Sequence, residues 1–187
     1  TDLKDPTKNW LLVKEERMKY LYWIKNKNAQ KVKFQRNRAQ AHYNSHRHSR
    51  NLILKSRQLG FTTDESIDSF DDVLFNPNYD CLVIAHEKQE AIKIFDNKID
   101  YAWRNFPEQL KMLWRVDIET RNALKFIFPD GSSSSHSVAT SGRSGTYQRI
   151  HISEFAKICK NSPLAAKEII EGTIPAIPTT GRLDIES

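Results

Sequence analysis

The chain has 187 residues, of which 39% are hydrophobic, and it carries a formal net charge of +6 at pH 7. This length corresponds to one domain, or to one domain with a helical appendage, and the hydrophobic fraction excludes a disordered chain. No window approaches the roughly 20 apolar residues of a membrane-spanning helix, so we expect no membrane association. The sequence begins with Thr1 rather than methionine, which suggests a chain trimmed from a longer protein.

The positive charge is concentrated in one stretch of the sequence. Residues 25–50 contain no acidic residue, whereas acidic residues gather at 64–72. A basic patch of this kind can bind phosphates by releasing counterions, and an ordinary solvated face explains the charge equally well. His42, His46 and His48 have no cysteine or acidic residue nearby, so a basic segment facing solvent or DNA is favoured over a metal site.

Hydrophobic periodicity predicts alternating strands and helices. Helices are expected at residues 9–26, 62–75, 88–105 and 163–171, the last with Ser162 as N-cap and Pro163 at its first position. Short apolar runs predict strands at residues 51–54, 80–85, 124–128, 137–140, 149–153 and 182–185. This alternation favours an α/β domain with a mostly parallel sheet.

The segment from Lys55 to Thr63 connects a predicted strand to a predicted helix. At such a connection, backbone N–H groups and the helix N-terminus converge on an anion. Compared with the phosphate-binding pattern G-x-x-x-x-G-K-[ST], the segment keeps Gly60 and Thr62 but has Lys55 for the first glycine and Phe61 for the lysine. Taken alone, a plain strand–turn–helix connection with basic surface residues is an equal alternative.

The loop nevertheless contains the groups that a phosphate needs. Lys55 and Arg57 are both available as cations, and the sequence does not decide between them. Arg57 could bind two oxygens through its planar guanidinium. Thr62 would hold Mg²⁺, and Thr63 could add a phosphate contact.

The segment from Arg149 to Glu154 is an apolar strand that ends in an acid, which is typical of a Walker B strand. Many such strands end in two acids, one near Mg²⁺ and one that polarises the attacking water. Here Ser153 takes the first place, and a serine would bind the metal only weakly, directly or through water. Glu154 takes the second place, where it is well positioned as a general base. Taken alone, an inert solvated glutamate is favoured.

Together, these two segments resemble the ATPase motifs of phage terminase large subunits. Lys55 to Thr63 looks like the altered Walker A motif of that family, and residues 150–157 look like the Walker B region of one branch. Residues 34–40 resemble the segment whose glutamine contacts adenine, which would be Gln40. Residues 85–87 and 141–146 also fit the family. The last residues, 185–187, look like the start of the coupling motif that links hydrolysis to movement.

The resemblance runs from about Phe34 to the end of the chain, and it implies a fold and a set of site residues. The fold is a P-loop NTPase of the additional-strand type, an α/β domain with a mostly parallel central sheet flanked by helices. It would occupy residues 34–187, after a helical and basic segment at 1–33. The resemblance implies ATP and Mg²⁺ as ligands. The implied nucleotide contacts are Gln40, Lys55, Ser56, Arg57, Gln58, Gly60, Thr62 and Thr63. The implied Mg²⁺ ligands are Thr62 and Ser153, the catalytic residues are Glu154 and a trans-acting Arg143, and the coupling residues are Glu186 and Ser187.

The family also implies partners. Its members assemble homo-oligomeric rings on a portal protein, together with a small terminase subunit, and pump double-stranded DNA into a preformed capsid in the cytoplasm of the infected bacterium. In the family a C-terminal nuclease domain cuts the DNA; we expect that domain to be absent from this sequence and therefore expect no nuclease activity. Because Phe61 and Ser153 depart from the usual lysine and acid, we expect weak nucleotide binding by the isolated domain.

Two alternatives remain from the sequence. Another P-loop enzyme, such as a helicase-type translocase, should carry helicase motifs further along, and none is visible in the sequence. A non-catalytic DNA-binding module would use only the basic stretch at residues 25–50, and complete lack of ATP affinity in the folded domain would favour it.

Overall fold

The computed structural model describes residues 10–56, 58–142 and 145–187. Its strands are β1 (Trp23–Lys25), β2 (Lys31–Lys33), β3 (Arg50–Ile53), β4 (Asp80–Ile84), β5 (Arg115–Glu119), β6 (Ala123–Ile127), β7 (Ser133–Ala139), β8 (Arg149–Ile152) and β9 (Arg182–Glu186). Its α-helices are α1 (Lys14–Tyr20), α2 (Arg38–His46), α3 (Phe61–Phe75), α4 (Lys88–Ile94), α5 (Tyr101–Arg104), α6 (Glu108–Lys111), α7 (Phe155–Asn161) and α8 (Pro163–Glu168). A 3-10 helix, η1 (Trp10–Leu12), and two π-helical segments, η2 (Phe95–Asp100) and η3 (Ile169–Thr173), complete the set.

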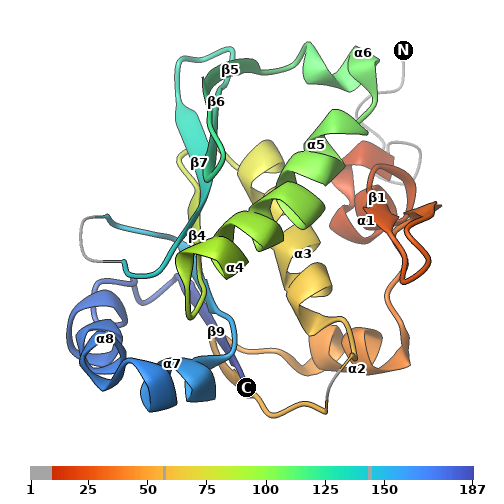
Figure 1. The fold of residues 1–187 in the computed structure, drawn as a ribbon. Helices are drawn as coiled ribbons and strands as arrows, with labels where there is room; N and C mark the ends of the chain where they lie inside the picture. Colours follow the sequence, from red (N-terminus) through yellow and green to blue (C-terminus); the bar gives the residue numbers. More distant parts are fainter. Residues whose placement is uncertain (1–9, 57, 143–144) are drawn as a thin grey trace.

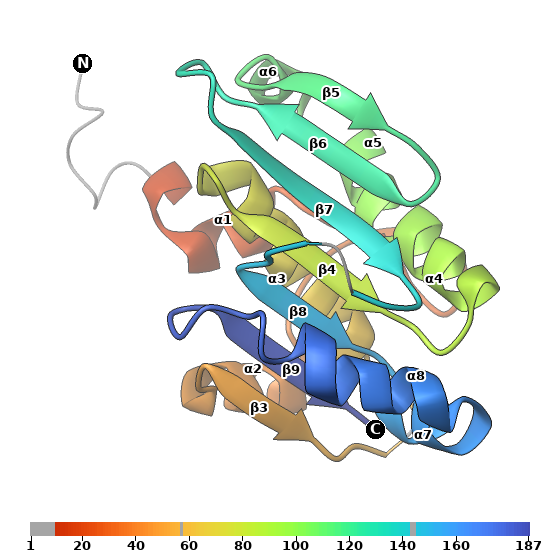
Figure 2. The same ribbon diagram turned by 90° about the vertical axis from the view of Figure 1, so that its left-hand side faces the viewer.

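The central sheet has the strand order β3-β9-β8-β4-β7-β6-β5 (Figure 2). Strands β3, β9, β8, β4 and β7 are parallel, β6 runs antiparallel to β7, and β5 runs antiparallel to β6. Strand β9 is inserted between β3 and β8, so it lies between the two strands that lead into the candidate phosphate-binding segments. The predicted mostly parallel α/β sheet is confirmed.

Helices cover the central sheet on both faces (Figure 1). Helices α3, α4 and α5 lie on one face, and α7 and α8 lie on the other. Strand β4 shows how the sequence builds two cores: Cys81 and Val83 pack with the α3 side, whereas Leu82 and Ile84 pack with the α7 and α8 side. A strand buried on both faces is expected to be apolar throughout rather than alternating, as this one is.

Helix α3 is buried almost all round, and its buried residues include several acids. Asp64, Glu65, Asp68 and Asp71 are fully buried. Charged side chains are almost never fully buried unless they are paired. Here Arg149 of β8 reaches Glu65 at 2.5 Å and Asp68 at 2.6 Å, so the sheet contacts this part of α3 through ion pairs rather than apolar packing.

The basic stretch at residues 25–50 contributes to the same network. Arg36 lies 2.8 Å from Asp64 and 2.5 Å from Asp68, and Arg47 lies 2.8 Å from Asp68. Burial raises the pKa of Asp68, but the surrounding cations outweigh this and hold it well below its usual range. Arg36 and Arg47 therefore belong neither to a free phosphate-binding patch nor to a simple solvated face, because their charges are satisfied by α3.

Gly60 is the N-cap of α3 and fixes the turn before it. Its φ is +74°, in the left-handed region that glycine adopts most readily. A Cβ at this position would lie 2.9 Å from Nε2 of Gln40, which donates a hydrogen bond to the Gly60 carbonyl at 2.8 Å. The backbone conformation therefore favours glycine, and a larger residue would also displace the Gln40 side chain.

The structure corrects the helix predicted at residues 9–26. Only η1 and α1 are helical there, and Trp23–Lys25 forms β1, paired antiparallel with β2. The side chain of Asn26 accepts hydrogen bonds from the N–H groups of Asn28 and Gln30, which closes the hairpin turn. Pairing with a later segment thus overrides the local helical periodicity.

The other predicted elements are found with shifted ends. The helix expected at 88–105 is present as α4, η2 and α5, and the helix from Pro163 continues through η3. The strand expected at 137–140 begins earlier, at Ser133. The sequence analysis missed β5, α2, α6 and α7 as well as the hairpin. No helix among the described residues is long and apolar enough to cross a membrane.

The N-terminal segment is tied to the α/β fold. Arg17 of α1 lies 2.6 Å from Asp71 of α3, and Met18, Leu21 and Tyr22 are part of the core on this face. The domain boundary after residue 33 stays a prediction.

The network predicts a large cost for removing Arg149. In Arg149→Met, Glu65 and Asp68 lose a buried partner, and we expect the free energy of unfolding to fall by about 3–5 kcal/mol, as for other broken buried ion pairs. The matched change Arg104→Met removes a guanidinium that is mostly exposed and paired with Asp100, and it should cost less than about 1 kcal/mol. Urea denaturation measures both values, and equal losses would contradict the structural role of Arg149.

A second prediction separates the two requirements at Gly60. Gly131 also has a positive φ, +84°, but a Cβ there would meet no atom within 4 Å. Gly131→Ala should therefore lower the stability only by the backbone strain, about 1–2 kcal/mol. Gly60→Ala introduces the same strain and also displaces the Gln40 side chain, so thermal denaturation should show a greater loss of stability for Gly60→Ala. A smaller loss at Gly60 would show that Gln40 moves freely.

Candidate nucleotide-binding site

Four segments meet at the edge where the parallel strands end. Lys55 follows β3, Ser153 and Glu154 follow β8, and Glu186 is the last residue of β9. Thr62 lies in the first turn of α3, which begins after the loop from β3. In open α/β sheets, ligands bind at the carboxyl ends of the strands, so this edge is the expected position for a site.

Glu186 joins these segments. Its Oε1 accepts hydrogen bonds from the hydroxyl of Thr62 and from the hydroxyl of Ser153 at 3.0 Å, and it lies 3.1 Å from Nζ of Lys55. The side chain of Glu186 is fully buried. We call Lys55, Thr62, Ser153 and Glu186 the Glu186 cluster.

The charge of Glu186 is stabilised by neighbouring cations. Burial raises the pKa of its carboxyl, but the charges of His151 and Lys55 and the hydrogen bond from Thr62 lower it to about 2. Burial correspondingly lowers the pKa of His151, and Glu186 raises it above its usual value. Nε2 of His151 lies 3.6 Å from Oε2 of Glu186. The cluster therefore holds a buried carboxylate at neutral pH.

The loop before α3 leaves backbone N–H groups without a capping side chain. Gln58 and Gly60 both have positive φ, and Gly60 has no side chain with which to cap the helix. The N–H groups of Thr63 and Asp64 donate hydrogen bonds to the Gly60 carbonyl at 3.1 and 3.0 Å. The N–H groups that come before these at the start of a helix have no intrahelical acceptor. Together with the helix dipole, they favour an anion at this end.

A cleft of about 710 Å³ adjoins this loop. It lies between the loop, the β1–β2 hairpin and the start of α2. Its lining residues include Lys25, Lys27, Phe34, Gln40, Gln58, Gly60, Thr63 and Lys98. Lys27 of the hairpin donates a hydrogen bond to Oε1 of Gln58 at 2.9 Å. The structure thus brings four of the predicted nucleotide-contacting residues, Gln40, Gln58, Gly60 and Thr63, to one cleft.

Gln40 holds the loop in place. Its Oε1 accepts from the Asn37 N–H at 2.8 Å, while its Nε2 donates to the carbonyls of Gly60 at 2.8 Å and Leu59 at 3.3 Å. Gln40 is buried. Its amide therefore links α2 to the turn before α3, and the predicted contact with adenine stays a prediction.

Glu154 follows Ser153 in an unusual conformation. Its φ is +58°, the left-handed region, and it is the N-cap of α7. Such backbone strain at a non-glycine residue clusters at functional sites. The carboxylate is partly exposed and lies 3.1 Å from Nζ of Lys157. Ser153 contacts the Glu186 cluster, and its neighbour Glu154 carries a second carboxylate at the same strand end.

The last residue of the chain connects the end of β3 to α7, the helix that follows β8. The N–H of Ser187 donates to the Ile53 carbonyl at 3.0 Å, and the N–H of Lys55 donates to the Ser187 carbonyl at 3.1 Å. The hydroxyl of Ser187 accepts from the N–H of Ala156 in α7 at 2.9 Å. The two predicted coupling residues, Glu186 and Ser187, thus contact both candidate phosphate-site segments.

Two predicted residues, Arg57 and Arg143, lie outside the described residues. Ser56 is described and exposed.

The sequence analysis missed the charged faces of β8 and β9. Arg149 and His151 alternate with apolar residues in β8, and the same alternation in β9 places Arg182, Asp184 and Glu186 on the face toward α3. A period of two with charged residues in otherwise apolar strands was the available signal.

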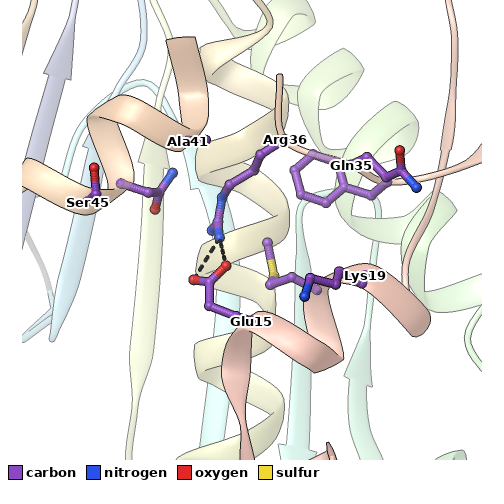
Figure 3. A pocket seen from close by; sticks show the side chains of 9 residues that line it. Glu15, Lys19, Gln35, Arg36, Ala41 and Ser45 are labelled. Atoms are coloured by element: carbon purple, nitrogen blue, oxygen red, sulfur yellow. Dashed lines mark hydrogen bonds and ion pairs between the residues drawn. The ribbon is translucent and has the colours of Figure 1, made fainter. Parts of the chain in front are cut away.

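A separate hollow of about 620 Å³ lies between α1 and α2. Figure 3 shows that Arg36 and Glu15 point toward each other in it, and their ion pair measures 2.7 Å. Lys19, Gln35, Ala41 and Ser45 also line it. Phe34 lines both this hollow and the cleft beside the loop, whereas no residue of the Glu186 cluster lines the hollow.

Comparison with known proteins gives matches to solved structures. No protein-family model matches the sequence, and no curated protein matches it. The large terminase ATPase domain of Thermus phage P74-26 matches with a TM-score of 0.64 and 18% identity, over 82% of this chain and 65% of that one. A variant of that domain gives 0.65 and 17% over the same shares.

The large terminase of bacteriophage HK97 matches with a TM-score of 0.60 and 10% identity, over 91% of this chain and 36% of that one. This chain therefore spans about two thirds of the Thermus phage domain and about a third of the HK97 protein. At these identities the likeness concerns the fold. The chain has the α/β fold of the ATPase domain of phage large terminases, as the sequence predicted.

Proposed function

We propose that this chain is the ATP-hydrolysing domain of a viral DNA-packaging motor. The observation that carries the proposal is the Glu186 cluster: a lysine, a helix-start threonine and a Walker B serine converge on one carboxylate at the carboxyl edge of a parallel sheet. The fold shared with phage terminase ATPase domains supports the same conclusion.

The triphosphate would be held by the loop before α3. Backbone N–H groups at the start of α3 and the dipole of that 15-residue helix favour the anion. Lys55, which lies at the start of the loop, supplies a cation, and Arg57 is the other candidate. The cleft beside Gln58 and Gly60 has room for the rest of the nucleotide.

The hydrolytic step would be carried by Glu154. Its carboxylate is partly exposed at the end of β8, so it could orient and deprotonate a water molecule for in-line attack. Thr62 and Ser153 would hold Mg²⁺, and both offer oxygen atoms, the ligand type that this ion prefers. When bound, Mg²⁺ would supply positive charge that offsets the negative charge of the phosphates.

Coupling to movement would begin at Glu186 and Ser187. Their hydrogen bonds join the end of β3, the start of the phosphate loop and the start of α7. Loss of the terminal phosphate would therefore alter the hydrogen bonds at the end of β3 and at the start of α7. We propose double-stranded DNA as the translocated substrate. The proposed partners are a portal protein, a small terminase subunit and further copies in a homo-oligomeric ring. Arg143 would act in a neighbour's site, and the host cytoplasm would be the place of action.

The alternative of a non-catalytic DNA-binding module has less support. It depends on the basic stretch at residues 25–50, and Arg36 and Arg47 within that stretch are engaged by the acids of α3.

Nucleotide titration of the folded chain tests the proposed function. We expect saturable binding of ATP-γ-S with Mg²⁺, and Lys55→Ala should weaken it by about tenfold or more because a charge-assisted phosphate contact is lost. Lys160→Ala removes an exposed lysine of α7 and serves as the charge-matched control, with affinity unchanged. Failure of the folded wild-type chain to bind would contradict the proposal and favour the DNA-binding module.

The role of Glu154 has its own test. In the assembled motor, Glu154→Gln should lower the rate of phosphate release by about a hundredfold or more because the general base is lost, while ATP-γ-S affinity stays within about twofold. Glu171→Gln removes an exposed carboxylate outside the cluster and should leave both quantities unchanged. Wild-type turnover in Glu154→Gln would reject Glu154 as the base.

A further inference from the structure

The strand that should carry a metal-binding acid carries a serine instead. Ser153 directly follows β8, is buried, and offers only a hydroxyl. Serine is a weak ligand for a divalent cation, whereas such cations in proteins usually have at least one carboxylate. A cation at this edge of the sheet therefore needs a carboxylate from another element.

Glu186 is positioned to supply this carboxylate. In the parallel register of β8 and β9, Ile152 is the partner of Ile185, so Ser153 and Glu186 follow side by side at the strand ends. The Ser153 hydroxyl reaches Oε1 of Glu186 at 3.0 Å, and the Thr62 hydroxyl bonds to the same oxygen. Three oxygen-bearing side chains from α3, β9 and the end of β8 thus converge.

Two further observations point to a cation at this position. The ammonium of Lys55 already lies 3.1 Å from Oε1 of Glu186, so a positive charge is held against the carboxylate. The second oxygen, Oε2, is buried and accepts no hydrogen bond from the described residues, since Nε2 of His151 is 3.6 Å away. The charge of His151 stabilises this oxygen across that distance without a hydrogen bond, so Oε2 remains available for direct contact with a cation.

We propose that Glu186, the last residue of β9, is the carboxylate ligand of the divalent cation in this site. It would supply the charged oxygen that Ser153, which follows β8, lacks. The hydroxyls of Thr62 and Ser153 complete the protein's oxygen ligands, and Lys55 neutralises Glu186 before the cation arrives. This inference rests on the proposed function, because the cation is the one that accompanies the nucleotide. It also gives Lys55 two roles, as the ion-pair partner of Glu186 and as a phosphate contact when the nucleotide binds.

The test measures how much Mn²⁺ strengthens ATP-γ-S binding, compared with the same titration in EDTA. Electron paramagnetic resonance of the Mn²⁺ signal reports the bound ion directly. In Glu186→Gln, we expect the Mn²⁺ effect to fall at least about tenfold, which is the lower end of the loss seen when even an outer-shell partner is removed. Affinity in EDTA should stay within about twofold, because the phosphate-binding loop itself is retained.

A rescue variant separates ligation from simple support of the fold. Glu186→Gln combined with Ser153→Asp moves the carboxylate from β9 to β8 and should restore the Mn²⁺ effect. Glu171→Gln is the control, because it removes an exposed carboxylate outside the Glu186 cluster, and it should keep the Mn²⁺ effect. A full Mn²⁺ effect in Glu186→Gln, or no rescue by Ser153→Asp, would overturn the proposal.

If Glu186→Gln does not fold, the single variant Ser153→Asp tests the proposal. A second carboxylate beside Glu186 should repel it in the absence of metal, so Mn²⁺ should raise the melting temperature of Ser153→Asp more than that of the wild type. An equal rise in both proteins would contradict the proposal. A wild-type chain that binds no nucleotide in either buffer would instead remove the proposed function, and the inference with it, which is a different pattern from loss of the Mn²⁺ effect alone.

Discussion

The pairing of the α3 carboxylates with arginines from the sheet and from the segments that flank α2 is the constraint on which this fold depends. Arg149 of β8 and Arg182 of β9 reach Glu65 and Asp68, and Arg36 approaches Asp68 from the segment before α2. Each of these carboxylates is removed from water, so its charge is tolerable only while its partners stay in place. The helix that begins at the candidate phosphate site is therefore fixed in position relative to the strands that complete the site.

The insertion of β9 between β3 and β8 converts this fixed framework into a site. Because the three strands are parallel, their ends bring Lys55, Ser153 and Glu186 to one edge of the sheet. The first turn of α3 places Thr62 against Glu186 as well. A carboxylate from the inserted strand then contacts both flanking motifs. The next residue, Ser187, extends these contacts, since it forms hydrogen bonds with the end of β3 and with α7.

Much of this fold could be predicted from the sequence, because the apolar run of β4 and the periodicity of α3 are local signals. The segment from Lys55 to Thr63 could be located for the same reason. The hairpin of β1 and β2 could not, since it depends on pairing between two segments that each look compatible with a helix or a loop. The burial of the α3 acids and the central place of Glu186 also lay beyond local patterns, because their partners come from distant parts of the chain.

The account's central claim is that a triphosphate is bound by the loop before α3, beside the Glu186 cluster. The most direct measurement is a crystal structure of the chain with ATP-γ-S. The account predicts phosphate density against the backbone of residues 58–62, at the N-terminus of α3 and within reach of Lys55. Density for the nucleotide in the hollow between α1 and α2, with the loop before α3 unoccupied, would contradict it.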